Sequence, residues 1–148
     1  MQSPSAPSNY NHEMVKVTLE SSPEDILFMA KQFISEQNFL DAETLLNRLA
    51  DHLRKKSIKE ERTADPLLET TLETLSELEL RLTNPHAAEP ILRELITLRE
   101  RNKGPNDPIL GKTVVEYCQV LRTLGRTAEA DRLEAKANAI LNRALSSH

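Results

Sequence analysis

Three glutamates in the middle of the chain, Glu69, Glu73 and Glu77, are spaced four residues apart and would share one face of a helix. Paired carboxylates on one face can act as a general acid and a general base. The same spacing is also typical of a solvent-exposed acidic face, in which each charge is hydrated. We favour the acidic face, because a row of like charges at helical spacing is usually a surface feature.

The other residue types that could do chemistry do not form a site in the sequence. No two histidines have a spacing that would place two metal ligands on one helical face. The three glycines are expected at helix ends rather than in a phosphate-binding loop, and no serine stands in a nucleophile elbow. We therefore expect no catalytic residue, no metal site and no cofactor, and the chain is not predicted to be an enzyme. The histidines are His12, His52, His86 and His148.

The single cysteine and one basic cluster each have a structural and a chemical interpretation. Cys118 cannot form an internal disulfide, and we expect it to pack in the core rather than to react. The basic cluster could complement the negative end of a helix dipole, or it could bind phosphate or an acidic peptide. The helix-dipole interpretation is favoured, and the other stays open. The cluster comprises Arg54, Lys55, Lys56 and Lys59.

The composition indicates helices. Hydrophobic side chains make up 39% of the 148 residues but aromatic ones only 3%, whereas strands favour aromatic and β-branched residues. The length predicts a single domain. No apolar run approaches the roughly 20 residues that span a bilayer, and the first residues do not resemble a secretory signal. We therefore expect a cytoplasmic protein that does not associate with membranes.

The net charge of −4 is unevenly distributed along the chain. Residues 1–98 carry 10 Lys or Arg and 17 Asp or Glu, whereas residues 99–148 carry 9 and 6. A domain that binds nucleic acid normally concentrates its Lys and Arg residues on one face. The charge balance therefore argues against nucleic acid as a partner.

The first segment, residues 1–21, is expected to be disordered or extended. It is rich in Ser, Pro and Asn, and Val15, Val17 and Leu19 alternate with polar residues, which is a weak strand signal. The segment either adds to the sheet edge of a partner or leads into the first helix, and the second interpretation is favoured. Ser22 then has the position of an N-cap for a helix that extends to about residue 37.

Small residues indicate an internal repeat. Ala30, Ser76 and Cys118 are each followed twelve residues later by an alanine. The offsets between these pairs are 46 and 42 residues, and several apolar positions recur with the same offsets. Antiparallel helices approach closely only where side chains are short, so the pattern predicts stacked helical hairpins. The three alanines are Ala42, Ala88 and Ala130.

Two connections carry a family resemblance. GPNDP at residues 104–108 ends one helix and caps the next, and LGRTAEAD at residues 124–131 supplies a glycine inside the last hairpin. With their surroundings over 88–141 these segments resemble tetratricopeptide repeats of the kinesin-light-chain type, and the match is looser over 23–87. The resemblance implies an all-α fold, a right-handed α-α superhelix of three helical hairpins with about six helices. The domain would cover residues 22–148, with units over about 23–57, 66–103 and 107–146.

The resemblance also implies a function in protein binding. In such arrays the first helices of successive units form the concave surface, and side chains there that are not needed for packing are free to bind a partner peptide or helix. We therefore expect a protein-interaction adaptor. The candidate partner-binding residues are Leu27, Lys31, Glu73, Glu77, Lys112, Gln119 and Arg122.

The last helix suggests an alternative function. No polar-faced helix follows it, so Ile140, Leu141 and Leu145 are expected to be partly bare and to mediate self-association or docking on a partner. A self-assembling scaffold, and thus a homo-oligomer, is therefore the alternative to an adaptor.

Some residues depart from the repeat. Glu79 and Glu134 occupy positions at which the other units have apolar residues. Pro90 is tolerable only near the start of a helix, so the helix that contains it is expected to begin between Pro85 and Ala88 or to kink.

Overall fold

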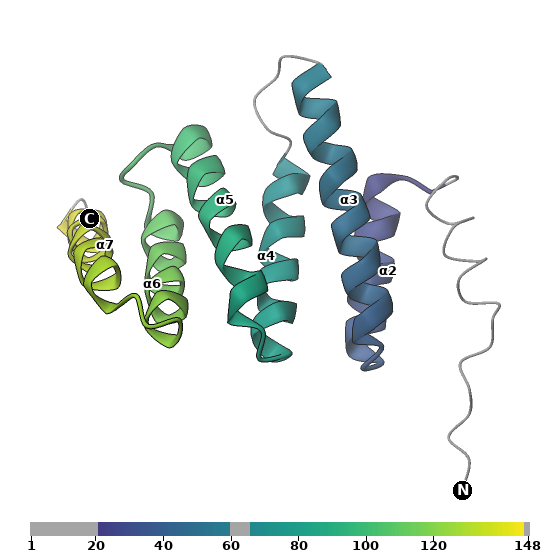
Figure 1. Ribbon diagram of the computed structural model, residues 1–148. Helices are drawn as coiled ribbons and strands as arrows, with labels where there is room; N and C mark the ends of the chain where they lie inside the picture. Colours follow the sequence, from purple (N-terminus) through teal and green to yellow (C-terminus); the bar gives the residue numbers. More distant parts are fainter. Residues whose placement is uncertain (1–20, 60–65, 147–148) are drawn as a thin grey trace, which may run out of the picture.

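The computed structural model describes residues 21–59 and 66–146, and the described chain is entirely helical (Figure 1). Within these residues there are six helices and no strand, which confirms the predicted all-α class. The segment expected to be disordered or extended, residues 1–21, lies outside the described residues except for Ser21. Of the described helices, none is both long enough and apolar enough to cross a bilayer. The helices are α2 (Pro23–Ser35), α3 (Phe39–Lys59), α4 (Pro66–Arg81), α5 (Pro85–Lys103), α6 (Pro108–Thr123) and α7 (Thr127–Ser146).

The helices pack in pairs and in two layers. α2 contacts α3, α4 contacts α5, and α6 contacts α7, so that each pair forms a hairpin. Contacts from α3 to α4 and from α5 to α6 join successive hairpins, and α2 also contacts α4 directly. We call α2, α4 and α6 the first-helix layer and α3, α5 and α7 the second-helix layer; in Figure 1, α3 lies in front of α2. Ion pairs join the second helices, from Arg54 to Glu94 at 2.8 Å and from Lys136 to Glu100 at 3.9 Å.

The six small residues of the predicted repeat are buried. Each of them is at most 1% exposed, and each lies on a helix that contacts the other helix of its hairpin. Short side chains at these places allow the two backbones to approach while larger residues around them interlock. Burial of Cys118 raises the pKa of its thiol, as expected for a packing residue.

The turn inside each hairpin repeats in its backbone geometry. One residue in each turn has a positive φ, namely Gln37 at 61°, Thr83 at 58° and Gly125 at 81°. These residues have the same offsets of 46 and 42 as the small residues. The next backbone N–H then donates to a carbonyl near the end of the first helix: Asn38 to Phe33 at 2.7 Å, Asn84 to Glu79 at 2.8 Å and Arg126 to Leu121 at 2.8 Å.

The predicted helix ends at Ser22 and Gly104 are present. The hydroxyl of Ser22 accepts a hydrogen bond of 3.2 Å from the N–H of Asp25 and so caps α2. Gly104 has a φ of 86° and donates its N–H to the carbonyl of Glu100 at 2.9 Å, which ends α5. Pro108 then begins α6.

The expectation that every glycine ends a helix is wrong for Gly111. This residue is buried inside α6. A Cβ atom placed on it would lie 2.9 Å from Leu141 Cδ2 and 3.4 Å from Ile140 Cγ2. The missing side chain therefore lets α7 pack closely against α6.

The residues that depart from the repeat have specific surroundings. α5 begins at Pro85, within the predicted range, and continues through Pro90, which is exposed. Glu79 is buried and accepts a hydrogen bond of 3.1 Å from the side chain of Asn84. Glu134 is half-buried and pairs with Arg122.

Candidate binding surface

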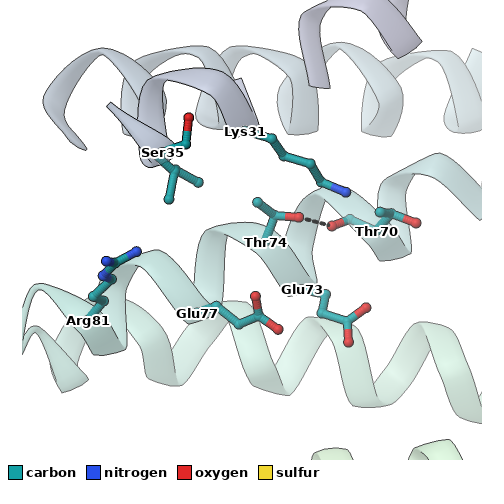
Figure 2. A pocket seen from close by; sticks show the side chains of 8 residues that line it. Lys31, Ser35, Thr70, Glu73, Thr74, Glu77 and Arg81 are labelled. Carbon is teal, nitrogen blue, oxygen red and sulfur yellow. Dashed lines mark hydrogen bonds between the residues drawn. The ribbon is translucent and has the colours of Figure 1, made fainter. Parts of the chain in front are cut away.

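A groove lies between α2 and α4 in the first-helix layer (Figure 2). Its volume is about 490 Å³, which is within the range of about 300–1,000 Å³ found for ligand pockets. Because α2 and α4 belong to different hairpins, the groove exists only when the first two hairpins are stacked. Its lining residues are Lys31, Ile34 and Ser35 from α2, and Thr70, Glu73, Thr74, Glu77 and Arg81 from α4.

Uncharged side chains also line the groove. The hydroxyl of Thr74 donates to the carbonyl of Thr70 at 2.8 Å, which leaves its oxygen able to accept another hydrogen bond (Figure 2). Ile34 adds an apolar wall from α2 and is itself half-buried. The groove therefore offers both apolar surface and hydrogen-bond acceptors.

A buried arginine neutralises part of the acidic row on α4. Arg99 of α5 donates hydrogen bonds to Glu73 at 2.9 Å and to the hydroxyl of Thr113 on α6 at 2.7 Å, and it lies 3.6 Å from Glu69. Asn102 also donates to Glu69, at 2.7 Å. The predicted solvent-exposed acidic face is therefore wrong for Glu69, whose side chain is only 13% exposed.

Two carboxylates close to Glu73, one on α4 and one on α6, form no ion pair with a described residue. Glu77 on α4 and Glu116 on α6 are exposed, and neither forms an ion pair with any residue in 21–59 or 66–146. Partial burial, followed by the negative charge of Glu73, raises the pKa of Glu77, whereas Lys31 and Arg99 oppose the rise. Partial burial and the charges of Glu77 and Glu73 likewise raise the pKa of Glu116. These two carboxylates therefore form a patch of negative charge without an ion pair among the described residues.

Three of the predicted partner-binding residues come together in the groove. Lys31 extends from α2 toward α4, and Glu73 and Glu77 lie on the opposite wall (Figure 2). Lys112 and Gln119 are exposed on α6 but do not line the groove.

The structure does not support two of the predicted binding residues. Leu27 is only 7% exposed, so its prediction as a binding residue is wrong; α2 contacts both α3 and α4, and the two contacts together cover a wide arc of this helix. Arg122 pairs with Asp131 at 3.1 Å and with Glu134 on α7. Its guanidinium thus joins α6 to α7 within the last hairpin.

The predicted apolar end is largely covered. The expectation that Ile140 is bare is wrong, because it is only 1% exposed and lies beside Gly111. Leu141 is half-buried against the same glycine, whereas Leu145 is 77% exposed. Only Leu145 of the three could meet a partner without rearrangement of α7.

Several groove residues were not predicted from the sequence. The stripe of α4 that carries Glu73 and Glu77 at helical spacing also carries Thr70, Thr74 and Arg81. This spacing was therefore a sequence signal that could have identified them. Glu116 had no such signal, because its role depends on the distance between α4 and α6.

The four residues of the basic cluster differ in their surroundings. Arg54 donates two hydrogen bonds of 2.8 Å to Glu94 on α5 and one of 2.7 Å to Asp51, so it joins two second helices. Hydrogen bonding to Glu94 raises the pKa of its guanidinium. Lys55, Lys56 and Lys59 are exposed.

Comparisons with known proteins do not assign the chain to a family. No family model matches the sequence. No curated protein matches it either.

Proposed function

We propose that the chain is a cytoplasmic protein-interaction adaptor of the tetratricopeptide type, which binds a partner peptide or helix on the face formed by α2, α4 and α6. The groove between α2 and α4 is the observation that carries this proposal, because it collects Lys31, Glu73 and Glu77 in one concave site. Its walls come from two hairpins, as expected for a surface that a repeat array builds by stacking.

The side chains that pack the fold are different from those exposed on the first helices, and this difference supports the same binding surface. Packing inside and between hairpins uses buried small residues, leucines and the ion pairs of Arg54 and Arg99. Lys31, Glu77 and Lys112 are exposed on the first helices and form no ion pair with a described residue. Side chains that the fold does not require are available to a partner.

A quantitative pulldown from an extract of the source cells tests the proposal. The full chain is compared with the triple variant Ser35→Ala, Glu77→Ala, Lys112→Ala, which changes one exposed residue on each first helix. The matched control is Lys55→Ala, Arg101→Ala, Arg132→Ala, which changes one exposed residue on each second helix. We expect partners to be lost with the first triple variant and kept with the second. Equal partner sets for all three proteins would overturn the proposal.

The second candidate function is self-assembly through the end of α7. Its support is the exposure of Leu145, a large apolar side chain that is 77% exposed. Sedimentation at micromolar concentration tests it by comparing the wild type with Leu145→Glu. An oligomer that the substitution dissociates supports the scaffold, and a wild-type monomer excludes it.

A further inference from the structure

The charged side chains that α4 contributes to the groove differ in their contacts within the fold. Glu73 accepts a hydrogen bond from Arg99, so its charge is balanced within the fold. Arg81 lies with its guanidinium carbon 5.2 Å from the centre of the Phe39 ring, a cation-π arrangement. Glu77 has neither kind of contact with a described residue, and its carboxylate lines the groove (Figure 2). A ligand that enters the groove would therefore meet a carboxylate without an ion pair on the α4 wall, and Lys31 on the α2 wall.

The shape and the lining of the groove also restrict what can enter. A volume of about 490 Å³ admits an extended side chain together with a short piece of its backbone. Ile34 and the methyl groups of Thr70 and Thr74 suit an aliphatic stem, and the threonine oxygens can accept hydrogen bonds near its tip. A long aliphatic side chain with a cationic end has these properties.

Other ligand types fit the groove less well. An acidic peptide could pair with Lys31, but it would also meet Glu77 and, beside it, Glu116, and these like charges would repel it. A purely apolar ligand would cover the carboxylate of Glu77 without giving it a partner, which costs free energy. A cation in the groove would instead give Glu77 a counter-ion.

We propose that this groove receives a lysine or arginine side chain from an extended partner peptide, with Glu77 as its principal counter-ion and Glu116 as a second negative charge nearby. The inference rests on the proposed adaptor function and adds the chemistry of the partner. Lys31 lies on the opposite wall and repels the incoming cation. Its removal is therefore expected to strengthen binding, whereas removal of the Glu77 charge weakens it.

The experiment begins with selection from a library of random short peptides displayed on phage, against the immobilised full chain. The inference predicts that selected peptides share a Lys or Arg at one position. Peptides without a shared basic residue that still lose binding to the triple variant on the first helices would overturn the inference and leave the adaptor function standing. If no peptide is selected, or if none depends on that face, both proposals fail.

Affinities of one selected peptide for single variants then test the role of Glu77. Glu77→Gln is expected to weaken binding by about three- to fivefold, the effect of one partly exposed ion pair, and Lys31→Met is expected to strengthen it. Glu100→Gln is the matched control, because Glu100 lies on α5, which does not line the groove. The loss with Glu77→Gln should shrink at high salt. Equal losses with Glu77→Gln and Glu100→Gln, or weaker binding with Lys31→Met, would contradict the inference.

Exchanging the two charges distinguishes a direct contact between Glu77 and the basic residue of the peptide from a general electrostatic attraction. The Glu77→Lys variant should reject the selected peptide and should bind a version in which the shared basic residue is glutamate. Failure of this exchange, with circular dichroism showing an intact helical fold, would place the basic residue elsewhere on the surface and overturn the inference.

Discussion

The hydroxyl of Tyr117 on α6 donates a hydrogen bond of 2.7 Å to the carboxylate of Glu89 on α5, and both residues are buried. Arg126, in the turn before α7, also donates to this carboxylate at 3.2 Å, and Arg93 donates at 3.0 Å. Burial alone would raise the pKa of Glu89, but the hydrogen bonds from Tyr117 and Arg126 outweigh it and lower the pKa below its usual value. The second and third hairpins are thus joined by one charged carboxylate.

Replacement of Tyr117 tests this junction. Tyr117→Phe keeps the ring and removes the donor, so we expect the free energy of unfolding to fall by about 1 to 3 kcal/mol at neutral pH. Urea denaturation measures the loss. Because a lowered carboxyl pKa stabilises the fold above the unfolded-state pKa, this contribution disappears as the pH falls through the folded-state pKa. The two proteins should therefore converge in acid, and a constant difference from neutral to acidic pH would contradict the assignment.

Glu79 should show the opposite pH dependence. Burial, followed by the negative charge of Glu43 and a hydrogen bond with it, raises the pKa of Glu79, and only Asn84 opposes the rise. A raised carboxyl pKa stabilises the fold below the unfolded-state pKa, and that contribution is lost as the pH rises through the folded-state pKa. Glu79→Gln should therefore increase the free energy of unfolding by about 1 kcal/mol at neutral pH and change little in acid. Thermal unfolding at several pH values checks this, and a destabilised variant at neutral pH would show that the charged form is needed.

Arg99 is expected to be one of the most sensitive residues for stability. Arg99→Met removes its hydrogen bonds to Glu73 and Thr113 and leaves Glu69 and Glu73 without their cation, so we expect a loss of about 3 to 5 kcal/mol. Adding Glu73→Gln should recover part of the loss, because fewer unpaired charges remain. Urea denaturation of the four proteins in this double-mutant cycle gives the coupling energy. A coupling near zero would mean that the pair of Arg99 and Glu73 does not stabilise the fold.

Turn residues with positive φ should respond in opposite ways to substitution. Thr83 is β-branched and has a φ of 58°, whereas Gly125 occupies the same place in the last hairpin with a φ of 81°. Thr83→Gly relieves strain and is expected to raise stability by about 1 kcal/mol, and Gly125→Ala is expected to lower it by a similar amount. Melting temperatures of the two variants test the prediction. Changes of the same sign in both would mean that the turns are not equivalent.

Local features of the fold could be predicted from the sequence. The cap at Ser22, the helix end at Gly104 and the buried small residues depend on nearby residues and on a repeat with fixed offsets. Gln37 and Thr83 were harder to identify, because neither residue type favours a positive φ and only their offsets from Gly125 mark them.

Features that depend on helix-to-helix distance could not be predicted. The expectation for Ile140 failed because Gly111, expected at a helix end, instead brings α7 against α6. The expectation for Leu27 failed because α2 packs against α4 as well as α3, so a wider arc of this helix is buried. The contacts of Arg99 span three helices, and no spacing in the sequence reveals them.

The most direct test of the binding surface is an NMR titration of the ¹⁵N-labelled full chain with a peptide from the selection. We predict that the largest amide shifts fall on α2, α4 and α6, around Lys31, Glu77 and Gln119, with small shifts on the second helices. Largest shifts on α3, α5 or α7 would contradict the assignment of the first-helix layer as the binding face.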